Sequence, residues 1–168
     1  MKNILIISAT KGQNLNLANS ICESIDTDFN KKVIVLEDFI LPLFTASTHV
    51  EDKSKYLSEI KKITNELVNS DGLVFCAPEY NGSIPPIVTN VIAWISVTTD
   101  YWRDAFANKV ALIATNSGGA GIKYNIAIKN QLEHLGMIVI PQYISVSGSN
   151  LPDSDSTKII LKQFIKHL

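Results

Sequence analysis

Residues 73–97 read LVFCAPEYNGSIPPIVTNVIAWISV, and they carry the clearest structural pattern in the chain. The apolar run Leu73–Cys76 has no polar alternation, which predicts a strand buried on both faces. A polar loop with two prolines follows. From Pro85 to about Val97 the residues predict a helix, because proline suits the first turn of a helix. A buried strand, a loop and a helix in this order form one unit of a parallel α/β sheet.

The same alternation of strand and helix runs along the rest of the chain. Short apolar runs predict the other strands at residues 4–7, 33–36, 110–114 and 138–146, the last of these interrupted by Pro141. Amphipathic segments predict the other helices at residues 14–25, 51–69, 121–135 and 154–168. Strict alternation predicts one α/β domain over residues 1–168. We expect a three-layer sandwich around a five-stranded parallel sheet in the flavodoxin-like order 2-1-3-4-5.

Composition agrees with one globular domain. The chain has 168 residues, 46% of them hydrophobic and 18% charged, so it can bury a core without a disulfide or a structural metal. We interpret Cys22 and Cys76 as reduced core residues, because both lie in apolar stretches. The formal net charge is −1 and no basic run exists, so we expect no nucleic-acid partner. No apolar segment is long enough to span a bilayer and residues 1–12 do not resemble a signal peptide, so we expect a cytoplasmic protein with no membrane partner.

Three loops rich in glycine, serine and asparagine follow the predicted central strands. They cover residues 8–16, 77–85 and 115–121. In doubly wound sheets, ligands bind outside the carboxyl ends of the strands, near the point where the strand order reverses. The sequence therefore predicts a ligand site built from these three loops.

The first loop, SATKGQNLN (8–16), runs from a buried strand into a helix N-terminus, which is a favourable place for an anion. Its hydrogen-bonding and charged side chains are Ser8, Thr10, Lys11, Asn14 and Asn16. A terminal phosphate is the expected ligand. The alternative is an ordinary polar turn in which Asn14 or Asn16 is the helix N-cap. The loop has neither the G-x-x-x-x-G-K-[ST] pattern nor the G-x-G-x-x-G fingerprint of other nucleotide sites.

The other two loops suit a planar ring. Residues 77–85 combine proline with an Asn-Gly pair, which predicts a rigid backbone able to present N–H and C=O groups to a heterocycle. Residues 115–121, TNSGGAG, contain three glycines that allow close approach of a ligand, and the next helix directs its positive end toward that ligand. The alternatives are a tight surface turn for the former and a flexible connection for the latter.

The residues PEYNGSIP (78–85), followed by Asn90 and Trp94, resemble the P-E-Y-N-G-S-I-P…N-x-x-x-W signature of the NADPH-dependent FMN reductase family. This family includes quinone, chromate and azo-dye reductases. Residues 41–44 resemble its L-P-L-Y segment, and residues 117–121 resemble its glycine-rich loop. The resemblance covers almost the whole chain.

This resemblance implies an FMN-dependent oxidoreductase that passes hydride from NADPH or NADH through bound FMN to a small-molecule acceptor. Because the flavin supplies the chemistry, we expect no catalytic side chain and no metal. Family members are usually homodimers or homotetramers, and Glu79 and Phe44 are candidates for the contact between subunits. The predicted cofactor-binding residues are Ser8, Thr10, Lys11, Asn14, Asn16, Leu17, Pro78, Glu79, Tyr80, Asn81, Gly82, Ser117, Gly118, Gly119 and Gly121.

The first loop departs from the family pattern G-S-x-R-x-x-S-x-N. Ser8, Ala9, Lys11 and Asn14 stand where the family has Gly, Ser, Arg and Ser, and only Asn16 matches outright. Lysine keeps the charge of arginine but lacks its bidentate fork. Two or three lost hydrogen bonds would weaken FMN binding roughly 100-fold.

Two other functions are alternatives. One is a one-electron carrier of the flavodoxin type, although such carriers are usually strongly acidic around the flavin. The other is a flavin-free interaction or sensory module, which the altered first loop would indicate. Among the aromatic residues, Trp94 is predicted to lie in the core, whereas Tyr101 and Trp102 are candidates for shielding a flavin or filling a subunit interface.

Overall fold

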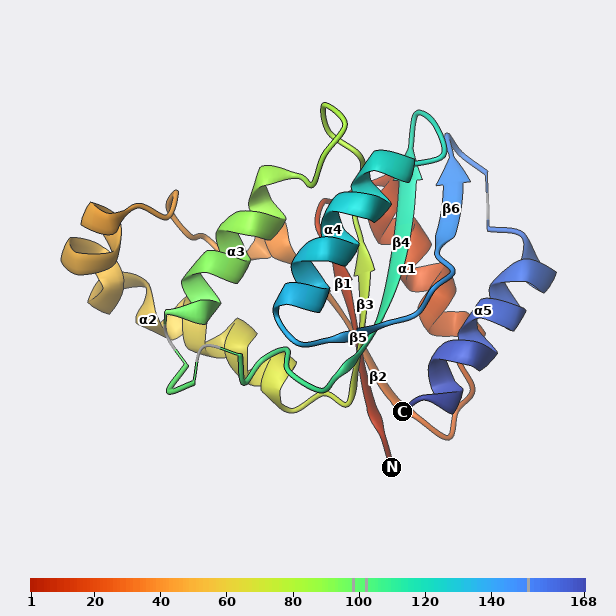
Figure 1. Cartoon of the computed structure of the whole chain (residues 1–168), viewed down its shortest axis with the longest axis horizontal. Coiled ribbons are helices and arrows are strands. Elements are labelled where there is room, and N and C mark those ends of the chain that lie inside the picture. The colour runs from red at the N-terminus through yellow and green to blue at the C-terminus, as the bar shows by residue number, and fades with distance from the viewer. Residues whose placement is uncertain (98, 102, 151) are drawn as a thin grey trace.

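The computed structural model describes the chain except residues 98, 102 and 151 and the side chains of residues 51–53. Strands and helices alternate along it, as the sequence predicts (Figure 1). The elements are β1 (Asn3–Ser8), α1 (Gln13–Ser24), β2 (Asn30–Val35), the short 3-10 helix η1 (Leu36–Asp38), α2 (Ala46–Val68), β3 (Gly72–Cys76), α3 (Pro86–Ser96), β4 (Val110–Ser117), α4 (Ile122–His134), β5 (Ile138–Val139), β6 (Ile144–Ser147) and α5 (Ser154–Lys166).

All strand pairs are parallel, and the sheet has the order β2-β1-β3-β4-β5. The fifth position is divided between two segments. β5 pairs with the start of β4, and β6 pairs with its last four residues, Ala114–Ser117. Pro141, which lies between the two segments, has no N–H to donate to a ladder. The predicted flavodoxin-like order and the interrupted fifth strand are confirmed.

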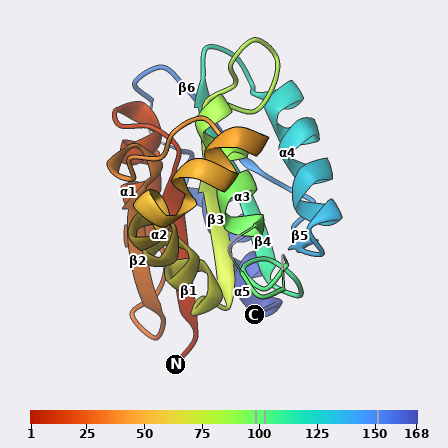
Figure 2. The same ribbon diagram turned by 90° about the vertical axis from the view of Figure 1, so that its left-hand side faces the viewer.

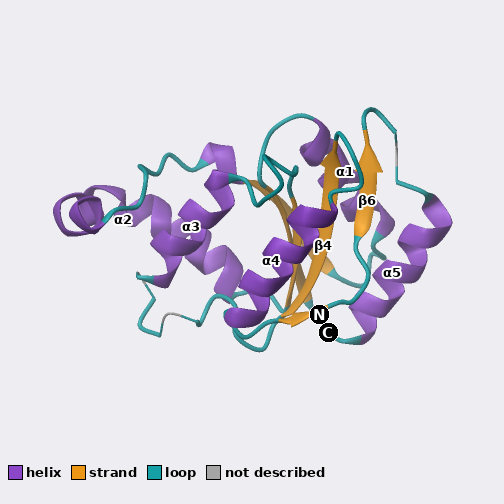
Figure 3. Cartoon of the chain, turned by 45° about the horizontal axis from the view of Figure 1, so that its top comes forward, coloured by secondary structure: helices purple, strands orange, loops and turns teal. Residues whose placement is uncertain are grey.

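Helices cover both faces of the sheet (Figures 2 and 3). Leu5 and Ile7 point into a core that also contains side chains of α2, α3 and α4. Ile4 and Ile6 point to the opposite face, into a core shared with α1 and α5. Successive side chains of a strand alternate between faces, so a strand covered on both sides must be apolar throughout. This is why residues 4–7 form an uninterrupted apolar run.

Helix α2 begins at Ala46, five residues before the predicted start at residue 51. Thr45 and Thr48 form a capping box, in which Thr45 Oγ1 accepts from the Thr48 N–H at 3.1 Å and Thr48 Oγ1 accepts from the Thr45 N–H at 2.8 Å. The first turns of α2 lie away from the sheet (Figure 1). Their residues therefore lack the apolar stripe from which the helix was predicted.

In the part of the chain that the structure describes, no helix combines the length and apolar character that crossing a membrane requires. The two cysteines are free: Cys76 is buried, and Cys22 packs half-buried against the core of α1 and α5. The predicted core position is confirmed for Cys76, whereas Cys22 lies at the margin of the core.

Candidate functional site

The three predicted loops meet at the carboxyl edge of the sheet, where the strand arrows end (Figure 1). Backbone hydrogen bonds continue past the strands and join the first two loops to their neighbours. The Ala9 N–H donates to the Cys76 carbonyl at 2.8 Å, and the Ala77 N–H donates to the Ala114 carbonyl at 3.1 Å. The start of each loop is thus fixed by the strand beside it.

Asn14 connects the first loop to the end of β4. Its side chain is only 3% exposed. Asn14 Nδ2 donates to the Asn116 carbonyl at 2.9 Å, and Asn14 Oδ1 accepts from the Asn116 N–H at 2.9 Å. Both polar groups of Asn14 are therefore used to hold α1 against β4.

The start of α1 has the features of an anion cradle. Gly12 is the N-cap residue, with φ 87°, and no side chain caps the helix in the described part of the chain. The alternative in which Asn14 or Asn16 caps α1 is wrong, because Asn14 binds Asn116 and Asn16 Nδ2 contacts Gln13 Oε1 at 3.4 Å. The first turn of α1 contains no acidic residue. Its N–H groups are therefore available to an anion.

Lys11 is already engaged by two carboxylates. Its N–H donates to Glu37 Oε2 at 2.7 Å, and its Nζ lies 2.8 Å from Asp38 Oδ1. The hydrogen bond and the charge of Asp38 raise the pKa of the Lys11 ammonium group. Neither partner is near Lys11 in the sequence, because both lie in η1, which comes beside the first loop through the pairing of β2 with β1.

The remaining predicted residues of the first loop differ in how open they are. Ser8 is fully buried, and its Oγ donates to the Thr10 carbonyl at 2.7 Å, which closes the loop on itself. Leu17 is 3% exposed and packs in the core of α1 and α5. A small cavity of about 70 Å³ lies beside the start of α1. Its lining residues are Gln13, Asn16, Leu17, Asn116, Ser149, Asn150 and Pro152.

The second loop folds into a tight turn. The Tyr80 N–H donates to the Ser83 carbonyl at 3.2 Å, and the Ser83 N–H donates to the Tyr80 carbonyl at 3.0 Å. Asn81 and Gly82 both have positive φ, of 51° and 71°, which is typical of a type I′ turn and explains the Asn-Gly pair. Pro78 is buried, whereas the Tyr80 side chain is 48% exposed at the edge of the sheet.

Glu79 joins the second loop to the third loop and to α4. Its N–H donates to Ser117 Oγ at 2.7 Å. Its Oε2 accepts from the N–H groups of Lys123 and Tyr124, at 3.0 and 3.1 Å. The positive end of α4, predicted to face a ligand, therefore already has a carboxylate on it. Glu79 acts here as an N-terminal cap supplied from a distant part of the chain.

Replacing Glu79 by alanine is expected to lower the free energy of unfolding by about 1–2 kcal/mol, because two N–H groups of α4 lose a charged acceptor. Chemical denaturation of the purified protein measures this. Glu133 is a matched control, since it is an exposed acidic residue at the other end of the same helix. Glu133→Ala is expected to be nearly neutral, and equal losses in the two variants would contradict the capping role.

The glycines of the third loop have different roles. Gly121 has φ 64°, and a Cβ there would lie 2.5 Å from Thr115 Cγ2, so both backbone and packing require glycine. A Cβ at Gly118 or Gly119 would meet nothing within 4 Å. These two exposed glycines border a depression of about 270 Å³, closed on its other side by residues 145–147 of β6. The space beside the loop is therefore open.

Two signature residues, Asn90 and Trp94, hold the segment 41–44 in place. Asn90 Nδ2 and Trp94 Nε1 both donate to the Pro42 carbonyl, at 3.0 and 2.9 Å. Asn90 Oδ1 accepts from the Phe44 N–H at 2.7 Å, and the Phe44 ring meets Trp94 edge-on at 5.2 Å. Trp94 is fully buried, which confirms its predicted place in the core. These residues shape the loop after β2.

Tyr101 and Trp102 were the aromatic candidates for shielding a flavin or filling a subunit interface. Tyr101 is 51% exposed, and its N–H donates to Asp104 Oδ2 at 3.2 Å. Trp102 lies outside the described residues. Its predicted role stays a prediction.

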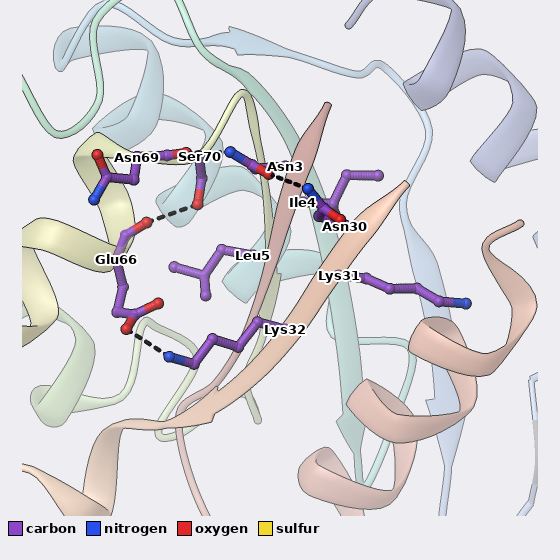
Figure 4. A pocket seen from close by; sticks show the side chains of 9 residues that line it. All are labelled: Asn3, Ile4, Leu5, Asn30, Lys31, Lys32, Glu66, Asn69 and Ser70. Atoms are coloured by element: carbon purple, nitrogen blue, oxygen red, sulfur yellow. Dashed lines mark hydrogen bonds and ion pairs between the residues drawn. The ribbon is translucent and has the colours of Figure 1, made fainter. Parts of the chain in front are cut away.

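A second cavity, of about 220 Å³, opens at the opposite edge of the sheet, where β1 and β2 begin (Figure 4). Several of its polar side chains are paired with one another. Asn30 Nδ2 donates to Asn3 Oδ1, and Lys32 Nζ donates to Glu66 Oε1. Nothing in the sequence predicts a site there.

Comparison with known proteins gives a consistent result. The model of the NADPH-dependent FMN reductase family matches residues 1–150. A quinone reductase from Escherichia coli is 28% identical over 134 residues, covering 76% of this chain and 68% of that protein. A flavoenzyme NAD(P)H:acceptor oxidoreductase from Paracoccus denitrificans has a TM-score of 0.77 at 17% identity, covering 99% of this chain and 95% of that one. An archaeal flavodoxin has a TM-score of 0.64 at 14% identity, covering 99% and 96%.

The structural similarities show a shared flavodoxin-like fold, as the strand order predicts. The family match spans most of the chain and includes the loops at the carboxyl edge. It also confirms the predicted class, an FMN-dependent NAD(P)H oxidoreductase. The chain belongs to the NADPH-dependent FMN reductase family.

Proposed function

We propose that the three loops at the carboxyl edge hold FMN, and that the enzyme uses NADPH or NADH to reduce a quinone or a similar small acceptor. The single observation that carries the proposal is the convergence of these loops through Asn14–Asn116 and Glu79–Ser117, which assembles one surface from three distant segments. The E. coli quinone reductase supports a quinone as the class of acceptor.

The residues present fit an FMN molecule at both of its ends. At the phosphate end, the glycine-capped start of α1 leaves N–H groups that suit an anion. At the ring end, Gly118 and Gly119 border open space, and the turn at residues 80–83 is rigid. Close approach of a flat ring to a backbone requires this combination of open and rigid segments.

Bound FMN would supply the hydride transfer, and the chain would supply binding and orientation. The turn at residues 80–83 would position the ring, because two backbone hydrogen bonds fix its shape. Burial raises the pKa of the Cys76 thiol far above its ordinary value, so this nearest cysteine stays protonated at neutral pH. The chain would then contribute hydrogen bonds and the shape of the site at the carboxyl edge, and not a reactive thiolate.

We also propose that the protein forms a homodimer or homotetramer in the cytoplasm. The loop after β2 carries exposed apolar side chains, with Ile40 79% and Leu43 72% exposed. Val50, in the first turns of α2, is 81% exposed. A group of exposed apolar side chains such as this favours contact with another protein surface. Size-exclusion chromatography with light scattering measures the oligomeric state directly.

A visible spectrum of purified protein, recorded alone and after addition of FMN and desalting, tests the proposal. Flavin absorption that is retained, is bleached by NADPH and returns on addition of a quinone is the expected result. A protein that retains no FMN would favour the flavin-free module. Semireduced flavin accumulating during titration would favour the one-electron carrier.

Gly119→Val is expected to weaken FMN binding at least about tenfold, while the free energy of unfolding changes by less than about 0.5 kcal/mol. The reason is that a Cβ at this position would meet no protein atom within 4 Å, so that the side chain would extend into the space proposed for the ring. Fluorescence titration with FMN and chemical denaturation measure the two quantities. Unchanged FMN affinity would place the ring elsewhere on the carboxyl edge.

A further inference from the structure

The first loop is in contact with two carboxylates of the chain itself. The Lys11 N–H donates to Glu37 Oε2, and Lys11 Nζ pairs with Asp38 Oδ1. Both acidic residues belong to η1, which follows β2 directly. The backbone donor and the cation that Lys11 would offer a phosphate are therefore both engaged by internal anions.

This contact has the chemistry of a phosphate contact. A carboxylate oxygen that accepts a backbone N–H before a helix makes the same kind of charge-assisted hydrogen bond as a phosphate oxygen. Glu37 and Asp38 are exposed, so burial does not hold either side chain in place. The rest of the cradle stays open, because α1 has no acidic residue in its first turn and no side-chain cap among the described residues.

We propose that Glu37 and Asp38 compete with the flavin phosphate for Lys11, and thereby set how strongly the site prefers FMN over riboflavin. The inference rests on the proposed function. Riboflavin has the same ring but no phosphate, so the two carboxylates should not affect its binding. FMN must displace the Glu37 carboxylate from the Lys11 N–H and must approach two negative charges.

The test compares the dissociation constants of FMN and riboflavin, measured by flavin fluorescence, in the wild type, Glu37→Gln, Glu37→Ala and Asp38→Asn. Release of an exposed ion pair is expected to change the affinity by a factor of up to about five. Each variant is therefore expected to bind FMN about three- to fivefold more tightly. Riboflavin affinity should change by less than about twofold. Asp26→Asn is the matched control, since Asp26 is exposed and follows the far end of α1.

A double-mutant cycle separates competition at Lys11 from a general effect of charge. In a Lys11→Met background, Asp38→Asn is expected to lose most of its gain, because no ammonium group remains to be released. An undiminished gain would overturn the role of Lys11. Equal changes in riboflavin and FMN affinity, or FMN binding that weakens in Glu37→Gln, would overturn the competition itself.

Failure of this inference is distinguishable from failure of the proposed function. If wild type and variants bind both flavins without a selective gain for FMN, only the competition is overturned. If neither flavin binds to the wild type or to any variant, the proposed function is overturned and the competition falls with it.

Discussion

Replacing Trp94 by alanine is expected to lower the free energy of unfolding by about 3–5 kcal/mol. The indole is fully buried, meets the Phe44 ring edge-on, and donates a hydrogen bond to the Pro42 carbonyl. Alanine would leave a large cavity between α3 and the loop after β2. Urea denaturation followed by circular dichroism measures the loss.

Trp94→Phe isolates the contribution of the hydrogen bond, because it keeps an aromatic ring but loses the indole N–H. Asn90 continues to donate to the Pro42 carbonyl, so this acceptor keeps one partner. A cost of about 1–2 kcal/mol is expected for Trp94→Phe. A cost below about 1 kcal/mol for Trp94→Ala would mean that the segment 41–44 is held by other contacts.

Replacing Asn14 by alanine is expected to cost about 2–4 kcal/mol of stability and to weaken FMN binding as well. The change leaves the Asn116 N–H and carbonyl without their partner in a buried place, and each orphaned group costs about 1–3 kcal/mol. The start of α1 then loses its tie to β4. Chemical denaturation and FMN titration measure the two effects on the same preparation.

Asn16 provides a matched control for Asn14. It is the same residue type, two positions further along α1, but it is exposed, and among the described residues its side chain contacts Gln13 Oε1 at 3.4 Å. Asn16→Ala is expected to change the free energy of unfolding by less than about 0.5 kcal/mol. If Asn14→Ala costs no more than Asn16→Ala, the tie to Asn116 contributes little in solution.

The fold was predictable because its pattern is local. Residues 4–7 and 73–76 are apolar at every position, which indicates strands covered on both faces, and both strands have that environment. The Asn81-Gly82 pair predicted a rigid loop, with a tight turn as the alternative, and both residues have the positive φ of a tight turn. In each case the information lies within a few neighbouring residues.

The site was less predictable because its contacts are distant in the sequence. The partners of Lys11 are 26 and 27 positions away, and those of Glu79 on α4 are 44 and 45 positions away. No spacing rule connects such residues. Lys11, Asn14 and Glu79 were predicted to bind a ligand, and the structure gives each of them a partner within the protein.

The tie between Asn14 and Asn116 also has a consequence for synthesis on the ribosome. The two residues are 102 positions apart, so the first loop leaves the ribosome long before its partner is made. Chains grow from the N-terminus at about 5–20 residues per second, so this interval lasts roughly 5–20 seconds. A nascent chain that ends before β4 lacks the tie that holds the start of α1. We therefore expect stalled nascent chains to capture flavin only when they are long enough for β4 to have left the exit tunnel.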